Sequence, residues 1–139
     1  MDRLMTRVAI PEALRTCMQT HAAQSPTVEV CGLLGARRGV PTGCYPIDNA
    51  APNPASRFDM DARGQIDAMR TMRERGETLF AIYHSHPRGP SAPSAVDLRE
   101  AAYPQALYLI LSPGRAGFQV HAWRLAGSRF VPVELIAEP

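Results

Sequence analysis

Two histidines at the end of an apolar run are the side chains in this sequence best placed to do chemistry. His84 and His86 stand two residues apart in the segment HSHP, directly after the run TLFAIY. Alternate side chains of a β-strand face the same side, so both imidazoles would point the same way. Asp97 follows after a turn stiffened by prolines. Two imidazoles and one carboxylate are a suitable ligand set for a catalytic zinc ion, which keeps one position open for water.

A hydrolytic metal site also needs groups that move protons and stabilise negative charge. Glu29 is the only acid in the apolar residues 28–34, and a carboxylate buried in such a segment needs a reason. We assign it the role of a general base that takes a proton from the activated water and returns it to the leaving amine. Ser94 would donate a hydrogen bond to the developing oxyanion. Ser94 and Asp97 also match the two ends of a capping box, so a structural role for this pair stays open.

The elements expected around these residues are strands and helices in a mixed order. The apolar run at residues 78–84 is continuous, as in a strand that is covered on both faces. We expect one α/β domain over residues 1–139, with a mixed, mostly antiparallel β-sheet flanked by helices. The strands are expected at residues 6–10, 27–35, 42–48, 78–84, 106–112, 118–125 and 130–136, and the helices at residues 11–25, 61–75 and 94–102.

Composition excludes several classes of function. The chain has 139 residues and a net charge of +2, with the two signs interspersed, so no nucleic-acid-binding surface is expected. All 15 basic residues are arginine, which excludes chemistry at a lysine amine. No segment approaches the roughly 20 apolar residues that cross a bilayer. Three cysteines without paired spacing, and an N-terminal segment without the apolar stretch of a signal peptide, predict a cytoplasmic protein with reduced thiols.

Other reactive or apolar residues are expected to be structural. Cys31 is expected to face the site as a small apolar side chain, because the metal-activated hydroxide already supplies the nucleophile. Arg57 and Arg88 are near the catalytic segment and could meet acidic groups on a partner, although exposed arginines are usually only solvated. The second helix has a stripe along the edge Ala62, Ile66, Met69 and Arg73, beside Met72, so its methionines are expected to belong to the core. A structural role is also expected for His21 and His121.

The motifs resemble a known family. Glu29 in PTVEVCGLLG and the later HSHPRGPSAPSAVD closely resemble the JAMM, or MPN-plus, metallopeptidases, whose pattern is Glu, then His-Ser/Thr-His, seven residues, Ser, two residues and Asp. The resemblance extends to FDMDARGQI and YPQALYLILS, so it spans most of the chain. It implies the cytidine-deaminase-like α/β fold of that family. It also implies Zn²⁺ held by His84, His86 and Asp97, with Glu29 as general acid/base and Ser94 as oxyanion donor.

The family resemblance also implies a substrate. JAMM enzymes cleave peptide or isopeptide bonds after the C-terminal Gly-Gly of ubiquitin or a ubiquitin-like protein, and this short chain is similar to their stand-alone prokaryotic branch. Members of that branch act on ubiquitin-like sulfur-carrier proteins, which they trim or from which they release cysteine. The tail would lie extended, added to a sheet edge by backbone hydrogen bonds. A homodimer is a further expectation that rests on the resemblance alone.

Two alternative functions and one alternative metal stay open. A non-catalytic MPN module could bind a ubiquitin-like tail, although a binder would not need Glu29. RadC-like domains share an HxHPxG turn, but they are generally joined to a helical DNA-binding region, and EVCGLLG favours the peptidase branch. Zinc deaminases need a PCxxC ligand pair that this sequence lacks. Iron also suits two histidines and a carboxylate, but zinc is expected for hydrolysis.

Overall fold

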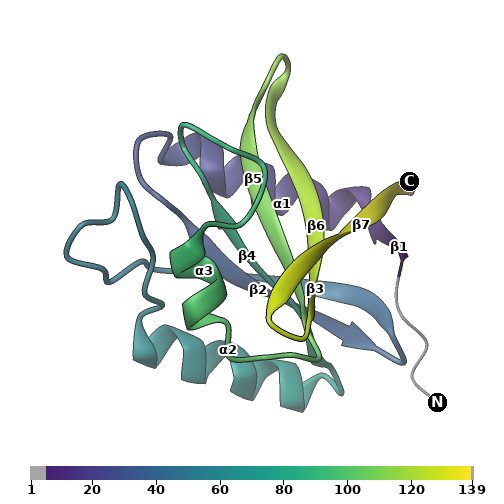
Figure 1. Ribbon diagram of the computed structural model, residues 1–139. Helices are drawn as coiled ribbons and strands as arrows, with labels where there is room; N and C mark the ends of the chain where they lie inside the picture. The colour runs from purple at the N-terminus through teal and green to yellow at the C-terminus, as the bar shows by residue number, and fades with distance from the viewer. Residues whose placement is uncertain (1–5, 139) are drawn as a thin grey trace.

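The computed structural model describes residues 6–138, which form a seven-stranded sheet with helices on both faces (Figure 1). Residues 1–5, part of the N-terminal segment in which no signal peptide is expected, lie outside the described residues. In chain order the elements are β1 (Arg7–Pro11), α1 (Glu12–Gln24), β2 (Cys31–Arg37), β3 (Val40–Ile47), α2 (Ala62–Glu74), β4 (Thr78–Ser85), α3 (Ala95–Glu100), β5 (Leu107–Gly114), β6 (Gly117–Ala126) and β7 (Arg129–Glu138).

The sheet is mixed and mostly antiparallel, as predicted. Its strand order is β1-β7-β6-β5-β4-β2-β3. The pairs β1–β7 and β4–β5 are parallel, and the other neighbouring pairs are antiparallel. Figure 1 shows α1 behind the sheet and α2 and α3 in front of it. None of the helices within residues 6–138 is long and apolar enough to cross a membrane.

Strand β4 contributes to a hydrophobic core on each face of the sheet, which confirms the expectation of double coverage. Ala81 and Tyr83 belong to the core on the α1 side. Ile82 belongs to the core on the α2 side. Because side chains alternate along a strand, His84 faces the same side as Ile82. The continuous apolar run therefore places the first histidine on the face that α2 and α3 cover.

Strand β2 begins four residues later than expected. It starts at Cys31 instead of residue 27, so Glu29 lies in the segment just before the strand. The backbone N–H of Glu29 donates to the Pro54 carbonyl (2.7 Å), and the N–H of Val30 donates to the hydroxyl of Ser85 (2.9 Å). A loop carbonyl and a side chain thus satisfy groups that a continuing strand would have paired.

The register of α2 differs from the expected one at one residue. Met72 is buried in the core as predicted, but the expectation that Ile66 packs there is wrong, since Ile66 is 56% exposed. The helix packs on the sheet through Ala68 and Met72. Residues two apart on a helix point in nearly opposite directions, so burial of Ala68 turns Ile66 toward solvent.

The expectation of reduced thiols is wrong for two of the three cysteines. Cys17 of α1 and Cys44 of β3 form a disulfide, with their Cα atoms 6.7 Å apart. They are separated by 27 residues in the sequence, and packing of α1 against β3 brings them together. Sequence spacing does not reveal such a pair, because the contact depends on tertiary packing. Cys31 is free and buried.

Candidate active site

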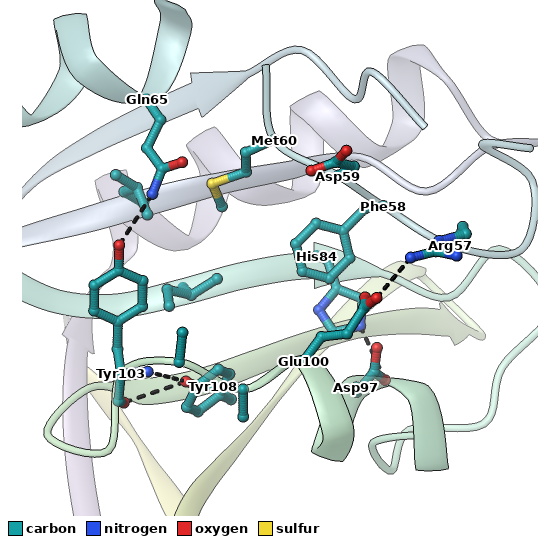
Figure 2. A pocket seen from close by; sticks show the side chains of 14 residues that line it. Arg57, Phe58, Asp59, Met60, Gln65, His84, Asp97, Glu100, Tyr103 and Tyr108 are labelled. Atoms are coloured by element: carbon teal, nitrogen blue, oxygen red, sulfur yellow. Dashed lines mark hydrogen bonds and ion pairs between the residues drawn. The ribbon is translucent and has the colours of Figure 1, made fainter. Parts of the chain in front are cut away.

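Three of the predicted site residues converge where β4 meets α3. The Nε2 atoms of His84 and His86 are 3.1 Å apart. Oδ2 of Asp97 lies 3.3 Å from His84 Nε2 and 3.2 Å from His86 Nε2. The histidines come from the end of β4 and the residue after it, and Asp97 comes from the first turn of α3. Figure 2 shows His84 directed at Asp97 across the end of a pocket.

Each imidazole is held by a different contact. Nδ1 of His86 lies 2.8 Å from the Pro90 carbonyl. Since a carbonyl oxygen only accepts, Nδ1 carries a proton, which in the neutral imidazole leaves Nε2 as the atom that can bind a cation. The ring of His84 stacks on Phe58, with the ring centroids 4.5 Å apart. Both contacts keep the Nε2 atoms directed at the same point.

Asp97 and Ser94 form the capping box that the sequence suggested. The N–H of Asp97 donates to Ser94 Oγ (3.0 Å), and the N–H of Ser94 donates to Asp97 Oδ2 (2.7 Å). This same Oδ2 atom faces the two histidines. The structural and the chemical interpretations of this pair therefore do not exclude each other, because the cap orients the carboxylate toward the imidazoles.

Glu29 lies close to the two histidines. Its carboxylate, His84 and His86 each offer a ligand atom, and these atoms lie within 4.8 Å of one another. The residue is 6% exposed, and among residues 6–138 its Oε1 atom has no hydrogen-bond partner. Burial raises the pKa of Glu29 to about 7, against the opposing effect of His86. A carboxyl group with such a pKa can both accept and donate a proton near neutrality.

The pKa values of the three neighbouring groups shift in different directions because their surroundings differ. Burial lowers the pKa of His84. Burial acts the same way on His86, but hydrogen bonds to Asp97 and the Pro90 carbonyl outweigh it and raise its pKa. Burial alone would raise the pKa of Asp97, yet hydrogen bonds with the two histidines hold it well below the usual range. Asp97 therefore stays ionised, the state in which a carboxylate binds a cation.

A pocket of about 470 Å³ leads away from His84 and Asp97. The sheet residues Leu33, Ile82 and Tyr108 line it, together with residues 57–60 and residues 100–103. One polar contact joins these two segments to each other, and a second joins residues 100–103 to α2, as Figure 2 shows. They are the ion pair Arg57–Glu100 (2.6 Å) and the hydrogen bond from Gln65 Nε2 to the Tyr103 hydroxyl (3.2 Å).

Three residues that shape the site were not predicted from the sequence. Phe58 stacks on His84, and Ser85 binds the backbone beside Glu29 through its hydroxyl. The side chain of Asn49 donates to the Glu29 carbonyl (2.9 Å). Phe58 lies in FDMDARGQI and Ser85 in HSHP, so position within a motif was the available signal for both. Asn49, in a loop rich in proline, gave no such signal.

The remaining candidates occupy more ordinary positions. Arg57 pairs with Glu100, and Arg88 is exposed. The imidazole of His21 hydrogen-bonds the Tyr83 hydroxyl (2.7 Å), in line with the structural role expected for it. Cys31 pairs with His84 across the sheet, and its thiol donates to the Ile47 carbonyl (S···O 3.4 Å). Burial raises the pKa of Cys31 to about 12, so this thiol is unsuited to act as a nucleophile.

Comparison with known families agrees with this geometry. The family described as prokaryotic homologs of the JAB domain matches residues 11–126. The chain belongs to this family. The matched range contains the proposed site residues, and it confirms the resemblance to stand-alone prokaryotic JAMM/MPN proteins.

Named relatives of this JAB-family chain are proteases. It is 29% identical over 140 residues to a desampylase from Haloferax volcanii, covering 96% of this chain and 98% of that one. It is 33% identical over 94 residues to a probable TtuB-protein conjugate cleaving protease from Thermus thermophilus, covering 68% and 63%. It is 30% identical over 128 residues to a CysO-cysteine peptidase from Mycobacterium tuberculosis, covering 91% and 84%.

Solved structures show the same fold. A solution structure of a protein from Desulfitobacterium hafniense superposes with a TM-score of 0.83 at 32% identity, covering 94% of this chain and 92% of that one. A solution structure of a protein from Salinibacter ruber gives a TM-score of 0.67 at 26% identity, covering 94% and 90%. The α/β fold class expected from the sequence is confirmed.

Proposed function

We propose that this protein is a zinc-dependent peptidase that hydrolyses the bond after the C-terminal Gly-Gly of a ubiquitin-like sulfur-carrier protein. The observation that carries the proposal is the triangle of donor atoms from His84, His86 and Asp97 next to the buried carboxylate of Glu29. Relatives named as a desampylase, a conjugate-cleaving protease and a CysO-cysteine peptidase support hydrolysis as the reaction.

The donor set fits zinc. Ligand atoms at about 2.0–2.1 Å from a tetrahedral zinc ion lie about 3.3 Å from one another. The donor atoms of His84, His86 and Asp97 are 3.1–3.3 Å apart, so these three residues would hold the ion. When bound, such an ion lowers the pKa of water and polarises a carbonyl group.

The protein's own groups would move the protons and stabilise the charge. Glu29 would take a proton from water at Oε1, the atom without a hydrogen-bond partner in the described part of the chain, and pass it to the leaving amine. Ser94 Oγ already accepts from the Asp97 N–H. Its own O–H remains to donate to the substrate carbonyl oxygen as that oxygen becomes negative.

The pocket would hold the carrier's tail. An extended tail could lie between residues 57–60 and 100–103, bound through its backbone as an added strand is. Glycines lack side chains, so Gly-Gly suits the end of the pocket at His84, where the Phe58 ring stacks on the imidazole. The scissile carbonyl would then lie beside the three donor atoms.

A direct test uses intact mass spectrometry. The zinc-loaded protein and its Glu29→Gln variant are incubated with sulfur-carrier proteins extended beyond Gly-Gly by cysteine, by a short peptide, or by a lysine-linked protein. We expect mass loss after Gly-Gly with the wild type alone, and the extension removed fastest identifies the leaving group. Binding of the tails without cleavage by the zinc-loaded wild type would contradict the proposal and leave a non-catalytic recognition domain.

The proposal includes a cytoplasmic location. The Cys17–Cys44 disulfide is the observation to test it against, because such bonds are rare in cytosolic proteins. Thiols are blocked with an alkylating agent at the moment of lysis, and the mass of the protein is measured. Three blocked cysteines would show that the protein is kept reduced in the cell and would support a cytoplasmic location. One blocked cysteine would show that the disulfide is present in the cell and would contradict that location.

A further inference from the structure

The segment that carries Glu29 is held mainly by groups from outside its own strand. The N–H of Glu29 donates to the Pro54 carbonyl (2.7 Å), and its carbonyl accepts from Asn49 Nδ2 (2.9 Å). On the other side, Ser85 Oγ accepts from the Val30 N–H (2.9 Å). Pro54 and Asn49 belong to the loop between β3 and α2, so this loop determines where the carboxylate group stands.

The side chain of Asn49 uses its full hydrogen-bonding capacity. Nδ2 donates to the carbonyls of Glu29 (2.9 Å) and Arg57 (3.0 Å). Oδ1 accepts from the N–H groups of Ala51 and Asp59 (both 2.9 Å). Carbonyls only accept and N–H groups only donate, so the amide has one possible orientation. An aspartate at this position lacks the two donors, and a glutamine is one methylene too long.

Through these bonds Asn49 joins two parts of the site. One is the backbone of Glu29, and the other is residues 57–59, which line the pocket. Phe58 lies between the two residues that Asn49 contacts there, and its ring stacks on His84. One amide therefore fixes the general base relative to both the pocket wall and an imidazole of the metal-binding cluster.

We propose that Asn49 is a positioning residue that holds Glu29 at the distance and angle needed for proton transfer to a tail bound in the pocket. This inference rests on the proposed function. The loop keeps other bonds when the Asn49 side chain is changed, namely Ala50 N–H to the Asp59 carbonyl (2.7 Å) and Asp61 N–H to the Asp48 carbonyl (2.9 Å). Loss of the side chain is therefore expected to shift Glu29 without unfolding the loop.

The variant Asn49→Asp separates the hydrogen bonds that the Asn49 amide accepts from those that it donates. A carboxylate keeps the acceptor for Ala51 and Asp59 but loses both donors, including the one to Glu29. A misplacement of about 1 Å in a catalytic group is enough to cost on the order of 100-fold in rate. We expect kcat on a carrier with a C-terminal extension to fall about 10- to 100-fold, with KM within about threefold of the wild type.

A matched control comes from the same loop. Asn53 is exposed, and its amide donates to the Ser56 hydroxyl (3.1 Å), which is not part of the site. Asn53→Asp should keep the wild-type kcat. The proposal is wrong if Asn49→Asp keeps kcat within about threefold, or if Asn53→Asp lowers kcat as much. If Asn49→Asp does not fold, Asn49→Ala, which adds no charge, is judged by the same kcat criterion.

Amide hydrogen exchange tests the inference independently of cleavage. It is followed by NMR on the metal-free wild type and Asn49→Asp proteins. We expect faster exchange at the Glu29 amide in the variant, unchanged exchange within β4, and retained protection of the Asp59 amide. Unchanged exchange at Glu29 overturns the inference. If the wild type cleaves no carrier, the proposed function fails by itself, and exchange still decides whether Asn49 holds Glu29.

Discussion

Glu29 and Glu77 are two carboxylates that are buried to the same extent, each in the segment just before a strand. Each is 6% exposed. Glu77, just before β4, accepts hydrogen bonds from the hydroxyls of Thr42 (2.5 Å) and Tyr45, so both of its oxygens are paired. Glu29 keeps one oxygen that has no partner among residues 6–138 and lies beside two histidines. Equal burial thus accompanies a structural role for Glu77 and the catalytic role that we propose for Glu29.

The difference shows which observation supports the catalytic role proposed for Glu29. Burial of a carboxylate is unfavourable unless hydrogen bonds replace its hydration. Glu77 meets that condition, and Gly43 makes room for it, because a Cβ atom there would lie 2.8 Å from Glu77 Oε2. Glu29 meets this condition only in part, because its Oε1 atom has no hydrogen-bond partner among residues 6–138. The unpaired oxygen, and not burial, distinguishes the acid that is available for proton transfer.

The largest expected effect is the loss of cleavage when Glu29 is neutralised. Glu29→Gln keeps the shape of the side chain but cannot take up a proton, so kcat should fall about 10²- to 10⁴-fold. Glu77→Gln should leave kcat within about threefold. Both values come from intact-mass progress curves on the same carrier. Equal losses in the two variants would show that burial alone sets the importance of these acids.

A second effect concerns zinc. Asp97→Asn retains an oxygen that can complete the capping box but removes the negative charge that faces His84 and His86. We expect zinc affinity to fall about 100-fold or more, measured by competition with a chromophoric chelator. Glu77→Gln is the control and should bind zinc like the wild type. Wild-type affinity in Asp97→Asn would remove this residue from the ligand set.

A third effect is on the free energy of unfolding, which should fall when Glu77 is replaced but not when Glu29 is replaced. Glu77→Ala leaves the hydroxyls of Thr42 and Tyr45 without their acceptor, so the free energy of unfolding should fall by about 1–3 kcal/mol in urea titrations. Glu29→Gln should leave it unchanged or raise it, because residues shaped for function are often not optimal for stability. If Glu29→Gln lowers the free energy of unfolding more than Glu77→Ala does, Glu29 is the more important of the two acids for stability, and this prediction is wrong.

The smallest expected effect concerns Cys31, a third buried titratable group, and the rate at which its thiol is alkylated. Burial, and then the charges of Asp48, Glu29 and Asp59, raise the pKa of Cys31 to about 12. Below that pKa the thiolate fraction rises about tenfold per pH unit, so alkylation of the folded, disulfide-bonded protein should be slow at pH 8 and increase about tenfold with each further pH unit. In urea, labelling should follow an ordinary thiol with a pKa of about 8.5. Rapid labelling of the folded protein at pH 7 would contradict this.

The parts of the site that could be predicted from the sequence are those that depend on local geometry. His84 and His86 share a face because a strand alternates, and Asp97 follows a short turn into a helix whose cap is visible in the sequence. Glu29 was found because an acid in an apolar segment is unusual. Its placement before the strand, instead of on it, depends on a bond to Pro54 that no local pattern reveals.

The parts that could not be predicted depend on contacts between distant segments. Asn49 is an ordinary loop residue until Glu29 and residues 57–59 surround it. The Cys17–Cys44 disulfide joins a helix to a strand across the core, so cysteine spacing did not predict it. Ile66 was placed on the wrong edge because periodicity indicates an apolar stripe but not the rotation at which the helix meets the sheet.

The alternation of side chains along β4 also has a consequence for how this fold can change. Odd-numbered positions Ala81 and Tyr83 and even-numbered positions Ile82 and His84 belong to separate layers. A substitution at Ile82 alters what the pocket accepts and leaves the α1 layer untouched. Inserting one residue would exchange the two sets and direct Tyr83 into the pocket. Specificity can therefore diversify by replacement along this strand, but not by a change in its length.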